Sequence, residues 1–137
     1  MKTGSAVLLL ILFHFSSLMT SQNKSREMVV QEGDTTFVLK QYFLCIYKKG
    51  SQGSQDSTEA SRLQSAHLQF INENAEKGLI VIAGPFGDDG EKRGILILDV
   101  ETLEAAIALV KKDPMVIAGR LDFEINPWWG PKGSSLK

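Results

Sequence analysis

The sequence predicts an α+β domain in which helices cover one face of an antiparallel sheet. Two short apolar, β-branched runs, at 79–82 and 95–98, flank a turn rich in Gly, Pro and Asp. A segment with helical spacing of its apolar residues precedes this pair of strands, and another follows it. Both strands are apolar at successive positions, so both faces of the sheet require cover.

Length and composition fit one globular domain. The chain has 137 residues, of which 43% are hydrophobic, and its formal net charge is -1. The sequence has no basic run or basic-aromatic stripe, so we expect no nucleic-acid partner. The single cysteine, Cys45, excludes an internal disulfide and a multi-cysteine metal site. We expect it to be buried and inert within its apolar strand.

The first 21 residues have the plan of a secretory signal peptide. Lys2 precedes an apolar centre at 6–15, and small and polar residues follow at 16–17 and 20–21. This centre is about ten residues long, whereas a membrane-spanning helix needs ~20. We therefore expect an exported protein, periplasmic or secreted, that is cleaved near Ser21 or Gln22 and has no membrane contact after cleavage. An uncleaved membrane anchor is the alternative.

The next two segments differ in character. Residues 22–34 are polar and mixed with no sustained period, and we interpret them as a linker or loose arm. Residues 35–48 are rich in aromatic and β-branched side chains, which predicts a central strand. The Gly- and Ser-rich residues 50–56 predict a flexible loop.

A first helix follows that loop and places a histidine toward the sheet. Ser57 or Thr58 is the expected N-cap, and Gly78 is a suitable stop. At 100° per residue, His67 lies near the middle of the apolar face that Leu63 and Phe70 help to form.

The C-terminal third predicts a second helix, a corner and a last strand. Thr102 is the expected cap of the second helix, which cannot continue past Pro114. Asp113 and Pro114 instead predict the cap and first residue of a short helical turn closed by Gly119. Residues 121–125 alternate apolar and charged, as in a strand with one solvated face. We expect Pro127 to Gly130 to end the fold and 131–137 to be loose.

The resulting order is strand, helix, strand, strand, helix, strand. This is the ferredoxin-like βαββαβ pattern, with both helices on one face of one antiparallel sheet. The other face would then expose the apolar side chains of the central strands. We expect that face to be buried against a second copy of the chain, which makes a homodimer.

Several short motifs, taken in order, resemble the YciI-like (YCII-related) domain family over about 41–130, within a domain that we expect to span 35–130. They are Ala66-His67-Leu68, Gly84-Pro85-Phe86, Asp88-Asp89-Gly90, Arg93-Gly94, Asp113-Pro114 and Pro127-Trp128. The resemblance implies a dimeric α+β barrel fold. It also implies that His67 and Asp113 form an active-site pair, and we expect the two to be within hydrogen-bonding distance.

The chemistry that fits these residues is proton transfer without a cofactor. Histidine titrates near neutral pH and is the best candidate for a general base or acid, while Asp113 can orient its ring. We expect a lyase- or isomerase-type reaction, elimination or proton transfer, on a small organic acid or aromatic compound. The alternatives are a non-catalytic ligand-binding or structural homodimer, and a core histidine paired with a capping aspartate.

Four further residues are candidates for substrate binding. The fork of Arg93 suits a carboxylate, although a surface ion pair with an acidic residue is an equal alternative. Phe86, Tyr42 and Trp128 are candidates to line a pocket, or else close one end of the core. Asp88 and Asp89 fit a tight turn better than a cation site, so we expect no metal.

Overall fold

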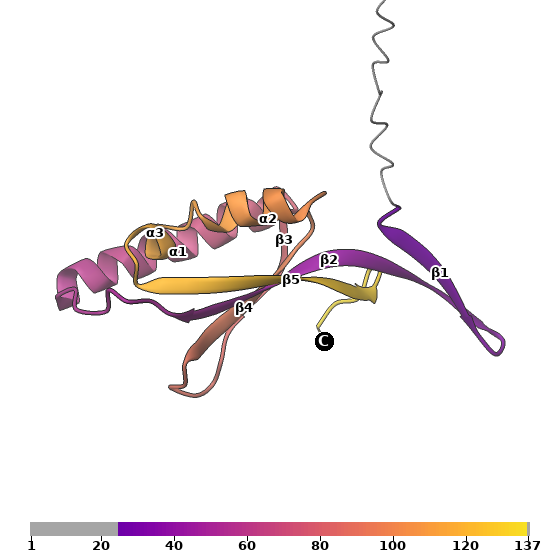
Figure 1. Cartoon of the computed structure of the whole chain (residues 1–137), viewed down its shortest axis with the longest axis horizontal. Coiled ribbons are helices and arrows are strands. Elements are labelled where there is room, and N and C mark those ends of the chain that lie inside the picture. The colour runs from indigo at the N-terminus through magenta and orange to yellow at the C-terminus, as the bar shows by residue number, and fades with distance from the viewer. Residues whose placement is uncertain (1–24, 137) are drawn as a thin grey trace, which may run out of the picture.

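The computed structural model describes residues 25–136, which form one five-stranded sheet and three helices. In chain order the elements are β1 (Glu27–Glu32), β2 (Thr35–Lys49), α1 (Ser57–Glu76), β3 (Ile80–Pro85), β4 (Lys92–Leu98), α2 (Leu103–Val110), α3 (Pro114–Ile117) and β5 (Leu121–Pro131). The helices lie on one side of the sheet (Figure 1). The predicted α+β class is confirmed. The predicted signal peptide, 1–21, lies outside the described residues.

The sheet is built around β2, which is long enough to serve three neighbours. β5 pairs with it antiparallel along one edge, from Leu39 to Lys49. Along the other edge, β1 pairs with residues 35–40 and β4 with residues 43–48. β3 pairs with the outer edge of β4. Without β1, the order β5-β2-β4-β3 is that of the predicted ferredoxin-like fold.

Alternation along the strands separates a helix-covered face from an open face. The helix-covered face is a continuous core made by strand and α2 side chains: Phe43, Cys45, Tyr47, Leu96, Leu98, Ala106, Leu109 and Val110. The residues between them point the opposite way because strand side chains alternate. On that open face Leu44 lies opposite Ile97, and Ile46 lies opposite Ile95.

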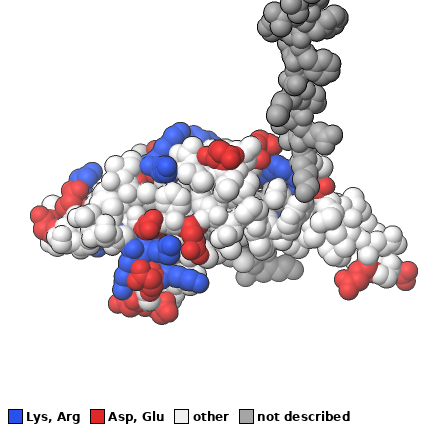
Figure 2. Space-filling view, viewed as in Figure 1, with Lys and Arg blue, Asp and Glu red and all other residues white. Residues whose placement is uncertain are grey.

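Most of the N-terminal arm from residue 25 onward is strand β1, which corrects the prediction of a loose segment at 22–34 for the part that the structure describes. Glu27 to Glu32 pair with Lys40 to Thr35, and Gly33 makes the turn with φ +58°. The sequence signal was Gly33-Asp34, a two-residue hairpin connection between residues of strand character. This hairpin of β1 and the start of β2 projects beyond the helical layer (Figure 1). It is mostly uncharged along its length, with acidic side chains at its tip (Figure 2).

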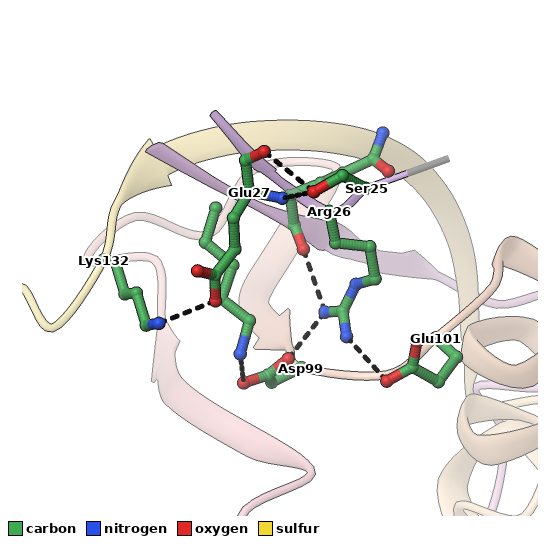
Figure 3. Close-up of polar contacts among 8 residues, drawn as sticks. Ser25, Arg26, Glu27, Asp99, Glu101 and Lys132 are labelled. Carbon is green, nitrogen blue, oxygen red and sulfur yellow. Dashed lines mark hydrogen bonds and ion pairs between the residues drawn. The ribbon is translucent and has the colours of Figure 1, made fainter. Parts of the chain in front are cut away.

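A cluster of ionised side chains, the Asp99 cluster, fastens this hairpin to the end of β4 (Figure 3). Arg26 Nη2 donates to Asp99 Oδ1 at 2.6 Å, and Lys40 Nζ donates to Asp99 Oδ2 at 2.6 Å. Arg26 also donates to Glu101 Oε1 at 3.1 Å. Burial works to raise the pKa of Asp99, but the hydrogen bonds and charges of Lys40 and Arg26 together lower it.

The C-terminal part of the sheet is longer than predicted. β5 runs to Pro131, so Pro127 to Gly130 continue the strand instead of ending the fold. Pro127 is tolerated because β5 is an edge strand, where a missing N–H breaks no sheet ladder. The tail, predicted to be loose from Pro131, still contacts the sheet at Lys132, whose amide donates to Val38 O at 2.8 Å.

Candidate functional site

Local capping fixes the helix that carries His67. The N-cap of α1 is Asp56, whose side chain accepts from the Glu59 amide at 2.9 Å, and not the predicted Ser57 or Thr58. All three residue types are good caps, and the extended φ/ψ of Asp56 decides the position. Past the other end, Gly78 has φ +72°, as predicted for a stop. The helix packs its apolar side on the sheet, and His67 is directed inward with its side chain 12% exposed.

Asp113 occupies the opposite side of the site, at the start of α3. Its Oδ1 accepts from the Met115 amide at 2.9 Å, and Pro114 takes the first helical position, as the sequence predicts. The Thr102 cap of α2 is likewise confirmed. Asp113 is 0% exposed, so its carboxylate depends entirely on protein donors.

His67 and Asp113 are in direct contact. His67 Nδ1 lies 2.7 Å from Asp113 Oδ2, so the predicted hydrogen bond is present. The Tyr47 hydroxyl donates to the same oxygen at 2.6 Å. A carboxylate that accepts these bonds fixes the hydrogen of His67 on Nδ1 and leaves Nε2 free to accept a proton.

Tyr47 is the member of the site that the sequence analysis missed. It is 3% exposed, and its ring meets the His67 ring edge-on with centroids 5.6 Å apart. Burial is the largest cause that raises the pKa of Tyr47, followed by the charge and hydrogen bond of Asp113, so its hydroxyl stays a donor. The available signal was strand alternation, which puts Tyr47 on the helix-covered face, where a buried hydroxyl needs a partner.

A cavity of about 630 Å³ opens beside His67. That volume lies within the usual range for a small-molecule site. One part of its wall is apolar and comes from α1, the sheet and α3: Leu68, Ile71, Ala83, Leu96 and Met115. His67 and Tyr47 line the same cavity. The imidazole therefore lies between a buried carboxylate and a space that a ligand can enter.

Three cationic side chains line the cavity at one end of the sheet. Lys49 ends β2, Arg93 lies at the start of β4, and Arg120 directly precedes β5. The antiparallel pairing brings these strand ends together. The absence of a side chain at Gly50 lets the end of β2 approach the segment before β5 closely, since a Cβ there would lie 2.1 Å from the carbonyl oxygen of Gly119. The cavity thus combines an apolar wall, an imidazole and a basic rim.

Arg93 makes the ion pair that the sequence left as an alternative. Its Nη1 donates to Asp89 Oδ1 at 3.0 Å and to Gly90 O at 3.4 Å. Arg93 and then Lys49 hold the pKa of Asp89 below its usual value. The Asp89 side chain is fully exposed, so this pair is accessible to solvent and to a competing anion.

The other three predicted substrate-binding residues do not line the cavity. Tyr42 and Trp128 pack on each other, with ring centroids 6.1 Å apart, at paired positions of β2 and β5. Phe86 follows β3 and is 41% exposed. A role in substrate binding stays a prediction for Phe86, Tyr42 and Trp128.

Two other predicted features can be located. Cys45 is buried as expected, and burial raises the pKa of its thiol to about 12, so it is a poor nucleophile. Among residues 25–136, His, Cys, Asp and Glu side chains form no group of three that would suit a metal ion. No helix in this part of the chain is long and apolar enough to cross a membrane.

Comparison with known proteins identifies the family. The YCII-related domain matches residues 42–129, which include the cavity, His67 and Asp113. The chain belongs to the YCII-related domain family. The predicted resemblance is thereby confirmed, and β1 with the first residues of β2 lies outside the matched region.

The comparison with solved structures finds similarity to 5-chloro-2-hydroxyhydroquinone dehydrochlorinase from Burkholderia phenoliruptrix AC1100, in complex with 2,5-dihydroxybenzoquinone. The two sequences are 23% identical, and the TM-score is 0.49. The match covers 63% of this chain and 92% of the dehydrochlorinase chain. No curated protein matches the sequence.

Proposed function

We propose that this YCII-related protein is a cofactor-free enzyme of the lyase or isomerase type. His67 is its general base, and Asp113 orients and stabilises the His67 ring. One observation carries the proposal: His67 contacts a fully buried carboxylate through Nδ1 while the same ring lines an open cavity. A base needs both a partner for its charged form and access to the proton that it removes.

The proposed step moves one proton. Nε2 of His67 accepts a proton from an acidic C–H of the substrate, and the C–H electron pair remains on the substrate. In an elimination, that pair forms a double bond as a leaving group departs from the adjacent carbon. In an isomerisation, His67 returns the proton to a different atom. Asp113 stabilises the imidazolium that exists after His67 accepts the proton and before His67 releases it.

Two observations support this function over a packed core histidine. A core histidine fills its own space, whereas His67 borders a cavity of about 630 Å³. The Tyr47 hydroxyl and the Met115 amide already satisfy Asp113 in part, so the His67 contact is not needed to cap α3. A non-catalytic ligand-binding protein uses the same cavity, and only a measurement of chemistry separates it from an enzyme.

Deuterium incorporation tests the proposal. Small organic acids and aromatic compounds that raise the melting temperature are incubated with the protein in heavy water, and NMR follows their acidic C–H positions. We expect incorporation with the wild type and a loss of roughly 10²-fold or more in His67→Gln, the range for removal of a general base. Gln69→Ala, on the exposed side of the same helix, is the matched control. Equal rates in wild type and His67→Gln would refute the proposal.

We propose further that the protein is a homodimer joined through the open faces of two sheets. Within residues 25–136 no helix covers that face, where the partly exposed Leu44, Ile46 and Ile95 lie in direct cross-strand pairs that also include the buried Ile97. Burial of this surface against a second copy removes it from water. Light scattering at micromolar concentration tests the assembly, and a stable monomer would contradict it.

We also retain export as a proposal, based on the signal-peptide pattern at 1–21. N-terminal sequencing of the protein from its native host should begin near Gln22. Intact Met1 in cytoplasmic material would contradict export.

A further inference from the structure

The basic rim of the cavity carries information about the ligand that His67 and Asp113 do not. Lys49, Arg93 and Arg120 line the cavity together with a single carboxylate, that of Asp89. Asp89 is already paired with Arg93. Among the residues that the structure describes, Lys49 and Arg120 form no ion pair within 4.0 Å.

Neutral groups hold these two cations in place without cancelling their charge. Arg120 Nη1 donates to the side-chain oxygen of Gln55 at 3.0 Å. Lys49 Nζ donates to the carbonyl oxygen of Asp89 at 3.3 Å. Within residues 25–136 the Arg120 side chain makes one hydrogen bond, to Gln55, so it has donors left over because a guanidinium carries five N–H groups. The rim therefore presents oriented donors with a net positive charge.

The rim and His67 come from different elements of the fold. The backbone of Gly50 donates to Arg120 O at 2.9 Å, which ties the end of β2 to the start of β5. His67 contacts the cavity from α1, beside Leu68, Ile71 and Met115. A bound molecule that fills the cavity thus meets the cations of the strand ends as well as apolar side chains and an imidazole.

We infer that the cavity binds a small organic carboxylate whose anionic group lies on Arg120 and Lys49 and whose apolar body extends toward His67. This inference rests on the proposed function, since it names the class of molecule on which His67 acts. Arg120 determines specificity for the anion because its planar fork matches a carboxylate with two parallel hydrogen bonds. Lys49 adds attraction as a point charge.

Matched probes test the inference through binding alone. Benzoate and benzamide have the same shape and differ in charge, and NMR titration of the protein gives both dissociation constants. We expect benzoate to bind roughly tenfold more tightly than benzamide, as for a charge-assisted pair of hydrogen bonds. Arg120→Gln should reduce that ratio about fivefold or more, with Lys49→Gln reducing it less. Lys111→Gln, at the end of α2 and outside the cavity, is the matched control.

The location of the anion has its own test. In His67→Gln the preference for benzoate should persist, since the cations that produce it are on the rim. Equal affinities for the two probes, no binding of benzoate at tens of millimolar, or an unchanged ratio in Arg120→Gln would overturn the inference. Loss of the preference in His67→Gln would also overturn it, because the anion would then lie on the imidazole. If benzoate is preferred and no compound exchanges deuterium, the proposed reaction fails and the anion site stands.

Discussion

Asp99 and Asp113 are both withdrawn from solvent and both held by short hydrogen bonds, but their partners differ in kind. Asp99 is neutralised by Arg26 and Lys40, each at 2.6 Å. Asp113 is bonded by a tyrosine hydroxyl, a backbone amide and an imidazole. Permanent cations fix the state of a carboxylate, whereas an imidazole partner can gain or lose a proton near neutral pH.

The surroundings of the two carboxylates follow the same division. The Asp99 cluster joins the projecting hairpin to the end of β4 (Figure 3). None of its residues lines the cavity beside His67. Asp113 lies inside the family-matched region, behind a histidine that lines the cavity. Charge pairing at Asp99 thus serves to attach a strand, while the pairing at Asp113 involves an imidazole that also lines the cavity.

Asp113→Asn should give the largest effect on stability. The side-chain amide offers one acceptor where the carboxylate offers two, so at least one buried donor around it loses its partner. We expect the free energy of unfolding to fall by on the order of 3 kcal/mol, measured by urea denaturation. Deuterium incorporation should fall as well, because His67 loses the group that fixes its tautomer. A loss of stability below about 1 kcal/mol would show that the buried hydrogen bonds to Asp113 do not stabilise the fold.

Asp99→Asn should have a smaller and more local effect. Arg26, with its side chain 13% exposed, and Lys40 lose their neutralising charge, which should cost about 2 kcal/mol. Hydrogen exchange should accelerate in β1 and the start of β2 and remain unchanged around His67. Glu101→Gln is the matched control, because within residues 25–136 the Glu101 side chain forms an ion pair with Arg26 alone and is 75% exposed. Equal acceleration of exchange in α1 would contradict a purely local role.

Tyr47→Phe should sharpen the comparison by removing one donor from Asp113 without touching its charge. The remaining hydrogen bonds to His67 and Met115 keep the carboxylate in place, so we expect a loss of about 1 kcal/mol in unfolding free energy. Tyr42→Phe is the control, since that hydroxyl has no hydrogen bond within the described part of the chain, and its effect should stay within about 0.5 kcal/mol. A larger loss of unfolding free energy for Tyr42→Phe than for Tyr47→Phe would contradict the role of Tyr47 as a stabilising donor to Asp113.

Patterns local in sequence predicted much of this structure. Strand alternation, caps and the Pro114 stop predicted the order of elements from β2 onward, and helical spacing predicted that His67 points inward. The motif resemblance supplied Asp113 as its partner. Both ends of the sheet were missed although the long strand at 35–48 was predicted. β1 and residues 126–131 pair with the first half of that strand, and the strand pattern alone does not show which segments pair with it.

The rest of the site was missed because it is made by distant strand ends. Lys49 and Arg120 come from segments about 70 residues apart in sequence that lie together only through the β2–β5 register. Tyr47 looked like one more aromatic residue in a strand. Its role becomes visible only when Asp113 is placed on the same side of the sheet.

Acidification should test whether Asp99 is held ionised, through an effect on stability that is smaller than the loss in Asp99→Asn itself. The pKa of folded Asp99 lies below its ordinary value of 3.8, because Lys40 and Arg26 outweigh the opposing effect of burial. A lowered pKa means that the folded state binds this proton less readily than the unfolded state. The stability that Asp99 contributes is therefore complete above pH 3.8 and is lost as the pH falls through the folded pKa.

Urea unfolding of the wild type and Asp99→Asn from neutral pH to about pH 3 measures this contribution as the difference between the two proteins. Exposed carboxylates with lowered pKa values, such as Asp89, are shared by both proteins and cancel in that difference. We expect the gap to narrow as the pH falls, and a gap that stays constant would mean that Asp99 is not held ionised by its two cations.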